Sequence, residues 1–401
     1  MKSVSLLIEF IFPSRQDGVF PINNFILLFS IIYLSLALLG NLLIDFIPIG
    51  FPALIMYFTF YLCLYIGASF GLMLPKIKLP KIFNNANYFL YFLLVLISIT
   101  TFWSWKIMLT KYGSLAFIYY NAYTIRLDSI GKTVSTIPVF FSYCNSFIYA
   151  LFVIYLVKLK NNLNTKYIIY LLIYCFVLIV LNDLLAFGRI GILYSIFCII
   201  GYIFYYKVKI NFKRIILFLL IIFIFALPRL IRGSFDNFKA SINNYEPYFK
   251  TEVPSSLNFL MTNYIYYFSS IYALSDYLNT TDFYMTNGER NFTPFYNVIN
   301  RFIINENKIT LIERNAKVPF SYNIYSIVKD LYTDFTYPGS IVVSLLFGLT
   351  IGFFARAKCH SISIYLIGWI LYTPIYNAFS FGGFFFSFVL LIILSLIVKE
   401  I

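Results

Sequence analysis

Long apolar stretches alternate with short polar or basic segments along almost the whole chain. A helix needs about 20 mostly apolar residues to cross the hydrocarbon core of a membrane, where its backbone groups must pair with one another. Ten stretches have this character, the seventh and ninth being short: 25–44, 52–74, 88–108, 137–157, 167–187, 190–206, 215–227, 340–355, 362–376 and 384–398. The pattern predicts an all-α, polytopic integral membrane protein with about ten transmembrane helices.

Composition indicates the same class of protein. Hydrophobic residues make up 61% of the chain and charged residues only 11%, whereas soluble domains carry about 45–50% and about 25%. A soluble globular enzyme is therefore excluded. The net charge of +14 would suggest nucleic-acid binding in a soluble protein. In this chain the positions of the basic residues indicate membrane topology instead.

Basic residues collect after the second, fourth, sixth and eighth apolar stretches. Lys and Arg mark the cytoplasmic loops of membrane proteins. The residues are Lys76, Lys78 and Lys81, then Lys158, Lys160 and Lys166, then Lys207, Lys209, Lys213 and Arg214, and finally Arg356 and Lys358. We therefore expect these loops and both termini to lie in the cytoplasm, and we expect no nucleic-acid partner.

One long polar segment, residues 228–338, follows the seventh stretch on the predicted outer side. Its acidic and basic residues balance, which suits a folded extracytoplasmic subdomain better than a disordered loop. The chain is thus divided into an N-terminal transmembrane bundle of about seven spans (1–227), the loop subdomain (228–338) and a C-terminal bundle of about three spans (339–401).

Helical spacing recurs inside this segment. Apolar residues over 257–272 predict an amphipathic helix, which either lies on the outer leaflet or covers a cavity between the spans. A second helix is expected over 293–302, with Pro294 in its first turn. A third, over 322–331, leads into the eighth span.

Arginines at the predicted outer face are the first candidates for chemistry. Their guanidinium groups stay charged and present a fork of donors that suits phosphate oxygens. Arg189 stands at the mouth of the sixth span, where it either pairs with Asp183 or binds an anion in a cavity. Arg229 and Arg232, at the end of the seventh span, suggest a diphosphate site, with snorkelling at the membrane surface as the alternative.

Other charged residues leave two interpretations open. Arg290 and Arg301 are weaker anion-binding candidates, because ion pairs within the balanced segment would also explain them. Asp334, just before the eighth span, is either a helix-capping acid or a site residue. A further group around the third outer loop is expected to face solvent or lipid headgroups: Lys106, Lys111, Arg126 and Lys132.

The sequence lacks the common motifs for nucleotide binding, metal binding and serine hydrolysis, and a GxxxG pattern in it has a structural meaning. There is no Walker loop, GxGxxG, HExxH or GxSxG, and neither the five cysteines nor the single histidine, His360, has metal-ligand spacing. We therefore expect no metal and no nucleotide cofactor. Gly348 and Gly352 form a GxxxG pattern, which predicts close helix packing.

Three stretches carry a resemblance to a known family. They are Gly188-Arg189 at the start of a span, PRLIRG at 228–233, and YNIYSIVKDLYTDFTYPGS at 322–340. With the hydropathy pattern and the long late loop, the chain resembles the O-antigen and capsule oligosaccharide repeat-unit polymerases, called Wzy. Members commonly show Tyr-x-Asp-Phe-Gly followed by a further glycine; here Tyr332, Asp334, Phe335 and Gly339 fit, and Thr336 replaces the first glycine.

The resemblance implies a metal-independent membrane glycosyltransferase of the GT-C type in the bacterial cytoplasmic (inner) membrane. It would transfer a growing glycan from undecaprenyl diphosphate to a hydroxyl of a lipid-linked repeat unit, with a chain-length regulator as a partner besides the membrane lipid. Cations would stabilise the departing diphosphate, and a carboxylate would accept the hydroxyl proton. His360 lies on the predicted cytoplasmic side and is unsuited to that role.

The candidate residues follow from these roles. Expected catalytic residues are Arg189, Arg232, Asp334 and Glu289, and expected substrate-binding residues are Arg229, Arg290, Arg301, Tyr264, Asn323, Tyr325 and Tyr332, with Tyr267 a further ring for sugar stacking. The alternatives are a flippase for lipid-linked oligosaccharides and an O-antigen ligase. A flippase would be expected to show two similar halves, and no internal repeat is visible.

Overall fold

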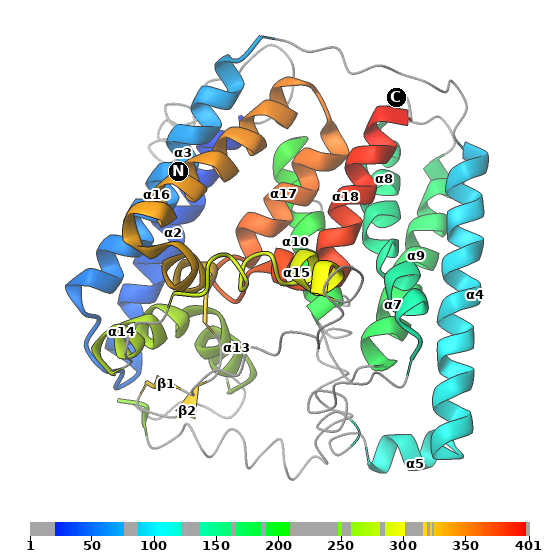
Figure 1. The fold of residues 1–401 in the computed structure, drawn as a ribbon, viewed down its shortest axis with the longest axis horizontal. Helices are drawn as coiled ribbons and strands as arrows, with labels where there is room; N and C mark the ends of the chain where they lie inside the picture. Colours follow the sequence, from blue (N-terminus) through cyan, green and yellow to red (C-terminus); the bar gives the residue numbers. More distant parts are fainter. Residues whose placement is uncertain are drawn as a thin grey trace.

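The computed structural model is a bundle of helices (Figure 1). It describes residues 21–75, 87–121, 125, 137–161, 165–185, 190–208, 248–250, 258–280, 285–300, 316–318, 321–322 and 325–397. Within these ranges the only sheet pairs two short antiparallel strands, β1 (Ala316–Lys317) and β2 (Ser321–Tyr322). The prediction of an all-α fold is therefore confirmed.

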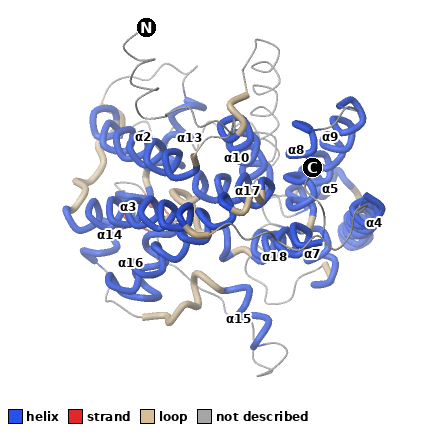
Figure 2. Tube along the Cα trace, turned by 90° about the horizontal axis from the view of Figure 1, so that it is seen from above, coloured by secondary structure: helices blue, strands red, loops and turns tan. Residues whose placement is uncertain are grey.

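The helices follow the predicted order. They are α2 (Ile22–Leu43), α3 (Phe51–Met73), α4 (Asn87–Tyr112), α5 (Leu115–Tyr120), α7 (Val139–Ser146), α8 (Ile148–Asn161), α9 (Thr165–Leu185), α10 (Ile190–Tyr205), α13 (Asn258–Phe268), α14 (Ser270–Thr280), α15 (Thr293–Ile299), α16 (Ile327–Arg356), α17 (His360–Tyr372), the 3₁₀ turn η4 (Ala378–Ser380) and α18 (Gly382–Ile397). Two views place α2, α3 and α16 on one side of the bundle, α10, α17 and α18 in the centre, and α4, α8 and α9 on the other side (Figures 1 and 2).

Six helices in the described ranges are long and apolar enough to cross a membrane. They are α2, α3, α4, residues Phe140–Lys160, α9 and α16, and the shorter apolar helices are α10, α17 and most of α18. Large apolar side chains face outward on several of them, for example Leu42 and Phe92, which are 69% and 61% exposed. This is the surface of a multi-pass membrane protein. Each predicted stretch except 215–227, which lies outside the described residues, coincides with these helices.

The boundaries differ from the predictions in three places. The fourth stretch consists of two helices, α7 and α8, which meet at Phe147. The helix predicted over 322–331 begins only at Ile327, because Ser321 and Tyr322 pair with β1. α16 then continues past residue 338, where we expected the loop subdomain to end. Pro294 does lie in the first turn of α15, as predicted.

Two pairs of glycines bring α3 and α16 into backbone contact. A Cβ atom on Gly348 would lie 2.3 Å from the carbonyl oxygen of Leu64, and one on Gly352 would lie 2.1 Å from that of Ala68. Gly67 and Gly71 of α3 face the backbone of α16 in the same way, at 2.2 and 2.4 Å. The prediction of close packing at the GxxxG pattern is confirmed, and its partner is a second small-residue pattern on α3.

The predicted amphipathic helix is broken at Ser269 into α13 and α14. The two helices pack on the ends of α2 and α3 through hydrogen bonds. Tyr57 donates to the hydroxyl of Ser270 over 3.1 Å, Tyr272 donates to the carbonyl of Ala37 over 2.6 Å, and Ser270 and Tyr272 are fully buried. This part of the predicted loop therefore belongs to the bundle. We call the end that carries α13, α14, β1 and β2 the loop end (Figure 1).

A break divides α16 near the loop end. Thr336 has φ 60° and ψ −179°, a backbone conformation that is essentially restricted to glycine. Pro338 follows two residues later and lacks the N–H that would bond across the break. The residues before the break form a separate helical segment at the loop end, and those after it form the apolar span.

Replacing Thr336 by glycine is expected to stabilise the protein, because glycine adopts this conformation without strain. The gain in the free energy of unfolding should be about 1 kcal/mol or more. The measurement is the thermal unfolding midpoint of the purified protein in detergent. Thr336→Ala is the matched control and should bring no comparable gain, since alanine retains the Cβ atom; equal midpoints for the glycine variant and wild type would contradict the argument.

Candidate functional site

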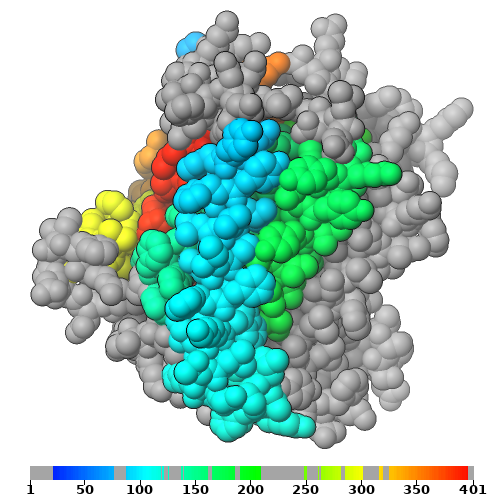
Figure 3. All heavy atoms as spheres, turned by 90° about the vertical axis from the view of Figure 1, so that its right-hand side faces the viewer, coloured from blue at the N-terminus to red at the C-terminus, as the bar shows by residue number. Residues whose placement is uncertain are grey.

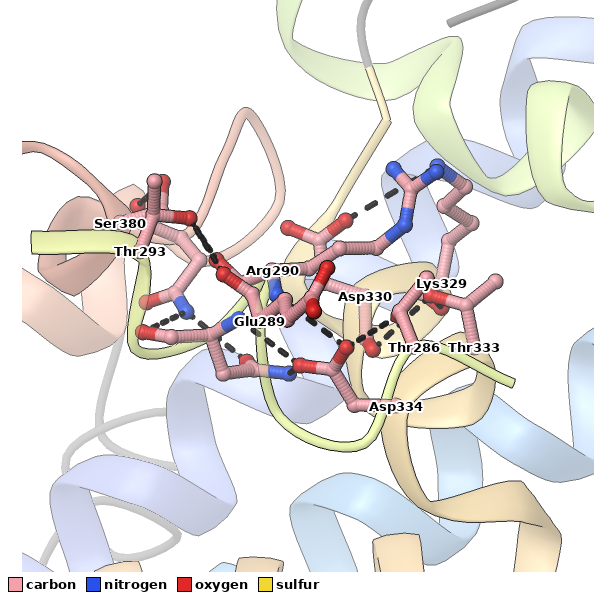
Figure 4. Close-up of polar contacts among 11 residues, drawn as sticks. Thr286, Glu289, Arg290, Thr293, Lys329, Asp330, Thr333, Asp334 and Ser380 are labelled. Carbon is pink, nitrogen blue, oxygen red and sulfur yellow. Dashed lines mark hydrogen bonds and ion pairs between the residues drawn. The ribbon is translucent and has the colours of Figure 1, made fainter. Parts of the chain in front are cut away.

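The carboxylate of Asp334 is the centre of a buried polar cluster at the loop end (Figure 4). Asp334 is fully buried. It accepts hydrogen bonds from the hydroxyl of Thr286, from the backbone N–H of Arg290 at 3.2 Å, and from both the backbone N–H at 2.8 Å and the side-chain amide at 2.6 Å of Asn291. An ionised carboxylate offers about four acceptor sites, and four donors use them.

The turn held by Asp334 has a local sequence that favours it. Asn287 and Gly288 both have positive φ, 49° and 92°, as expected of an Asn-Gly turn. The backbone N–H of Thr286 donates to the carbonyl of Thr333 over 2.9 Å, which adds a second attachment to α16. The turn over 286–292 therefore has a fixed position beside the first segment of α16.

Asn291 extends the cluster to a third element. The side-chain amide of Asn377, in the connection between α17 and α18, donates to Oδ1 of Asn291 over 2.8 Å. Oδ1 of Asn377 in turn accepts from the backbone N–H of Phe379 over 3.1 Å, and both asparagines are fully buried. Neither asparagine is recognisable in the sequence, because isolated asparagines in a chain rich in asparagine give no signal.

A buried lysine, Lys329, lies five residues before Asp334 on α16. Lys329 is 1% exposed, and its Nζ lies 3.9 Å from Oδ1 of Asp330. The same Nζ lies 4.7 Å from the ring centroid of Tyr325 and 5.2 Å from that of Tyr277, so a carboxylate and two aromatic faces compensate for its loss of water. In the sequence, Lys329 and Asp330 are only part of the balanced charge of the segment. The available signal was the spacing of four residues between Asp330 and Asp334, which places the two carboxylates on one helix face.

Arg290 and Glu289 are the partly exposed charged residues of the held turn. The backbone of Arg290 is fixed by Asp334, and its side chain points toward the side of the cluster where Lys329 and Asp330 lie (Figure 4). Cations and carboxylates thus alternate at this end of the bundle. Arg290 and Glu289 are therefore a partly exposed donor of hydrogen bonds and a partly exposed acceptor next to each other in the chain.

The predicted sugar-binding tyrosines have mainly packing contacts. Tyr264 donates to the carbonyl of Leu36 over 2.5 Å, and burial raises its pKa to about 12. Tyr267 donates to the carbonyl of Leu371 over 2.6 Å, and Tyr325, 2% exposed, covers Lys329. Tyr332 is half-buried and is the one of these four for which the contacts leave stacking with a sugar open.

Asp183 caps a helix. Its two carboxylate oxygens accept the backbone N–H groups of Gly191 at 3.1 Å and Ile192 at 2.7 Å, which satisfies the first turn of α10 and places a negative charge at its N-terminus. Arg189, the partner considered for Asp183, lies outside the described residues, as do Arg229, Arg232, Arg301 and Asn323. The structure therefore brings together Asp334, Glu289 and Arg290 of the predicted site.

Within the described ranges, no three or more His, Cys, Asp or Glu side chains are placed to hold a metal ion. Comparison of the chain with models of protein families, with curated proteins and with solved structures finds no match.

Proposed function

We propose that the protein polymerises undecaprenyl-diphosphate-linked oligosaccharide repeat units into O-antigen or capsular polysaccharide at the outer face of the bacterial cytoplasmic membrane. The observation that carries this proposal is the Asp334 cluster, which fixes the turn bearing Glu289 and Arg290 at one end of an apolar helix bundle. A lipid-linked substrate could approach this end from the membrane. The resemblance of residues 322–340 to the polymerases supports the same assignment.

The distribution of basic residues supports the orientation that this function requires. Lys158, Lys160, Arg356 and Lys358 lie at helix ends opposite the loop end. The end of the bundle rich in Lys and Arg faces the cytoplasm in most membrane proteins. The proposal therefore places the loop end outside and both termini inside, with ten spans in a GT-C arrangement.

The proposed chemistry uses charges that are in position before the reaction. A hydroxyl oxygen of the acceptor unit attacks the anomeric carbon of the donor, and the bond from that carbon to the diphosphate oxygen breaks. Negative charge grows on the leaving diphosphate, where Arg290 would stabilise it. Arg189, Arg229 and Arg232 are proposed to share this role. No metal ion is needed in this scheme.

The proton of the attacking hydroxyl needs an acceptor, and Glu289 suits this role better than Asp334. All four acceptor sites of Asp334 already receive donors from the turn and from Asn291. Glu289 is partly exposed and neighbours Arg290. We therefore propose Glu289 as the general base and Asp334 as a residue that positions the turn.

Replacing Arg290 by alanine tests the proposal in cells that lack the chromosomal gene and carry the variant. Loss of one group that stabilises transition-state charge lowers rates by about 10²–10³, so the ladder of surface glycan on a gel should collapse to a band carrying a single repeat unit. Arg290→Lys keeps the positive charge but loses the planar set of N–H donors of the guanidinium group, and it should give a short ladder.

The control is Lys317→Ala, which removes an exposed basic residue of the same segment and should leave the ladder intact. Membrane levels of each variant are compared by immunoblot. Loss of every glycan-bearing band would instead indicate a flippase or a ligase, and an unchanged ladder in Arg290→Ala would contradict the role of Arg290.

A further inference from the structure

A lateral groove lies between α4 and α9, two helices that are side by side on the face of the molecule shown in Figure 3. Its volume is about 500 Å³, and it is lined by seven residues of α4 between Leu94 and Lys106 and by Tyr174 of α9. The groove is independent of the proposed glycan chemistry. Both of its helices are candidate membrane spans, so it opens toward the lipid.

The surface of the groove is apolar although it contains hydroxyl groups. Ser98 donates to the carbonyl of Leu94 over 2.7 Å, and its oxygen lies 2.8 Å from the hydroxyl of Tyr174. The two hydroxyls therefore satisfy each other and join the helices. Val95 and Phe102, each 56% exposed, form walls that a hydrocarbon chain can contact.

A cation and an indole close the groove toward the loop end. Nζ of Lys106 lies 4.9 Å from the ring centroid of Trp103, and both side chains are exposed. Tryptophan is enriched at the level of lipid headgroups, and lysine there attracts anionic lipids. From Leu94 to Lys106 the helix rises about 18 Å at 1.5 Å per residue, close to the roughly 15 Å depth of one leaflet.

We infer that this groove binds one acyl chain of an anionic phospholipid, with the lipid phosphate at the ammonium group of Lys106. The depth of the groove fits one chain within a single leaflet, and the position of the cation fits the headgroup. The exposed charge favours an anionic lipid over a zwitterionic one. Of the two surroundings predicted for Lys106, solvent or lipid headgroups, this inference corresponds to the headgroups.

Fluorescence quenching by brominated lipids tests the inference on the full-length protein. The protein is reconstituted in phosphatidylcholine vesicles that contain a small, fixed fraction of either chain-brominated phosphatidylglycerol or chain-brominated phosphatidylcholine. The difference between wild type and Trp103→Phe isolates the signal of Trp103, which lines the groove. We expect brominated phosphatidylglycerol to quench Trp103 as strongly as brominated phosphatidylcholine would if its local concentration were about five times higher.

Two variants separate the groove from the rest of the surface. Lys106→Gln should abolish the preference, whereas Lys111→Gln, which removes another exposed lysine of α4 outside the groove, should retain it. Val95→Phe should reduce quenching by filling the groove. Equal quenching by the two lipids, or a preference that survives Lys106→Gln, would overturn the inference.

Discussion

Replacing Gly348 by alanine is expected to lower the free energy of unfolding by about 3 kcal/mol or more, because overpacking costs that much when the neighbour cannot move. The new Cβ atom would lie 2.3 Å from the carbonyl oxygen of Leu64 and 2.9 Å from the backbone nitrogen of Ala68. Both neighbours are backbone atoms of α3, so only separation of the two helices can relieve the clash. The measurement is the thermal unfolding midpoint in detergent, with the amount of protein in membranes as a second readout.

The matched control is the same substitution at Gly382, the first residue of α18. A Cβ atom there meets nothing closer than the ring of Phe386 at 3.7 Å. Alanine is a better helix former than glycine by up to about 1 kcal/mol, so this variant should be as stable as wild type or more so. If Gly348→Ala and Gly382→Ala unfold at the same temperature, the close approach of α3 and α16 is wrong.

Replacing Asp334 by asparagine should cost stability as well as activity. The substitution turns one acceptor oxygen into a donor, which faces either the donors of Thr286 and Arg290 at the Oδ1 position or the two donors of Asn291 at the Oδ2 position. Breaking a buried charged arrangement costs about 3–5 kcal/mol. We expect a lower unfolding midpoint in detergent together with loss of the glycan ladder. If the variant lost the ladder but unfolded like wild type, Asp334 would act in the chemistry itself. The proposal that Asp334 only positions the turn would then be wrong.

Asp276→Asn is the control for this substitution. Asp276 is partly exposed and accepts the backbone N–H of Lys317 over 3.1 Å. The replacement keeps an acceptor oxygen for a single neutral hydrogen bond, whose net contribution is only about 1 kcal/mol. Its unfolding midpoint should therefore stay close to that of wild type, and the ladder should remain.

Part of the candidate site was predictable from single residues. Asp334 stood out because it lies just before an apolar span, where charged groups are rare. Arg290 was a weaker anion-binding candidate within the balanced segment, and Glu289 was a candidate only for the carboxylate role that the resemblance implies. Lys329 and Asn377 did not, because their importance depends on which residues surround them after folding. The contacts of the tyrosines were not predictable for the same reason: Tyr264 donates to the backbone of α2, and no sequence pattern indicates such a contact.

The sequence by itself determined the class of the protein, the positions of the long helices and the close-packing glycines of α16. These follow from local properties: a run of apolar residues spans the hydrocarbon core as a helix wherever it occurs, and a glycine leaves room on its own helix face. The tertiary structure alone decided that α3 is the partner of α16, that α13 and α14 join the bundle, and that four donors converge on Asp334. Those outcomes depend on contacts between residues far apart in the chain, such as Asn291 with Asn377, and hydropathy contains no information about which distant surfaces meet.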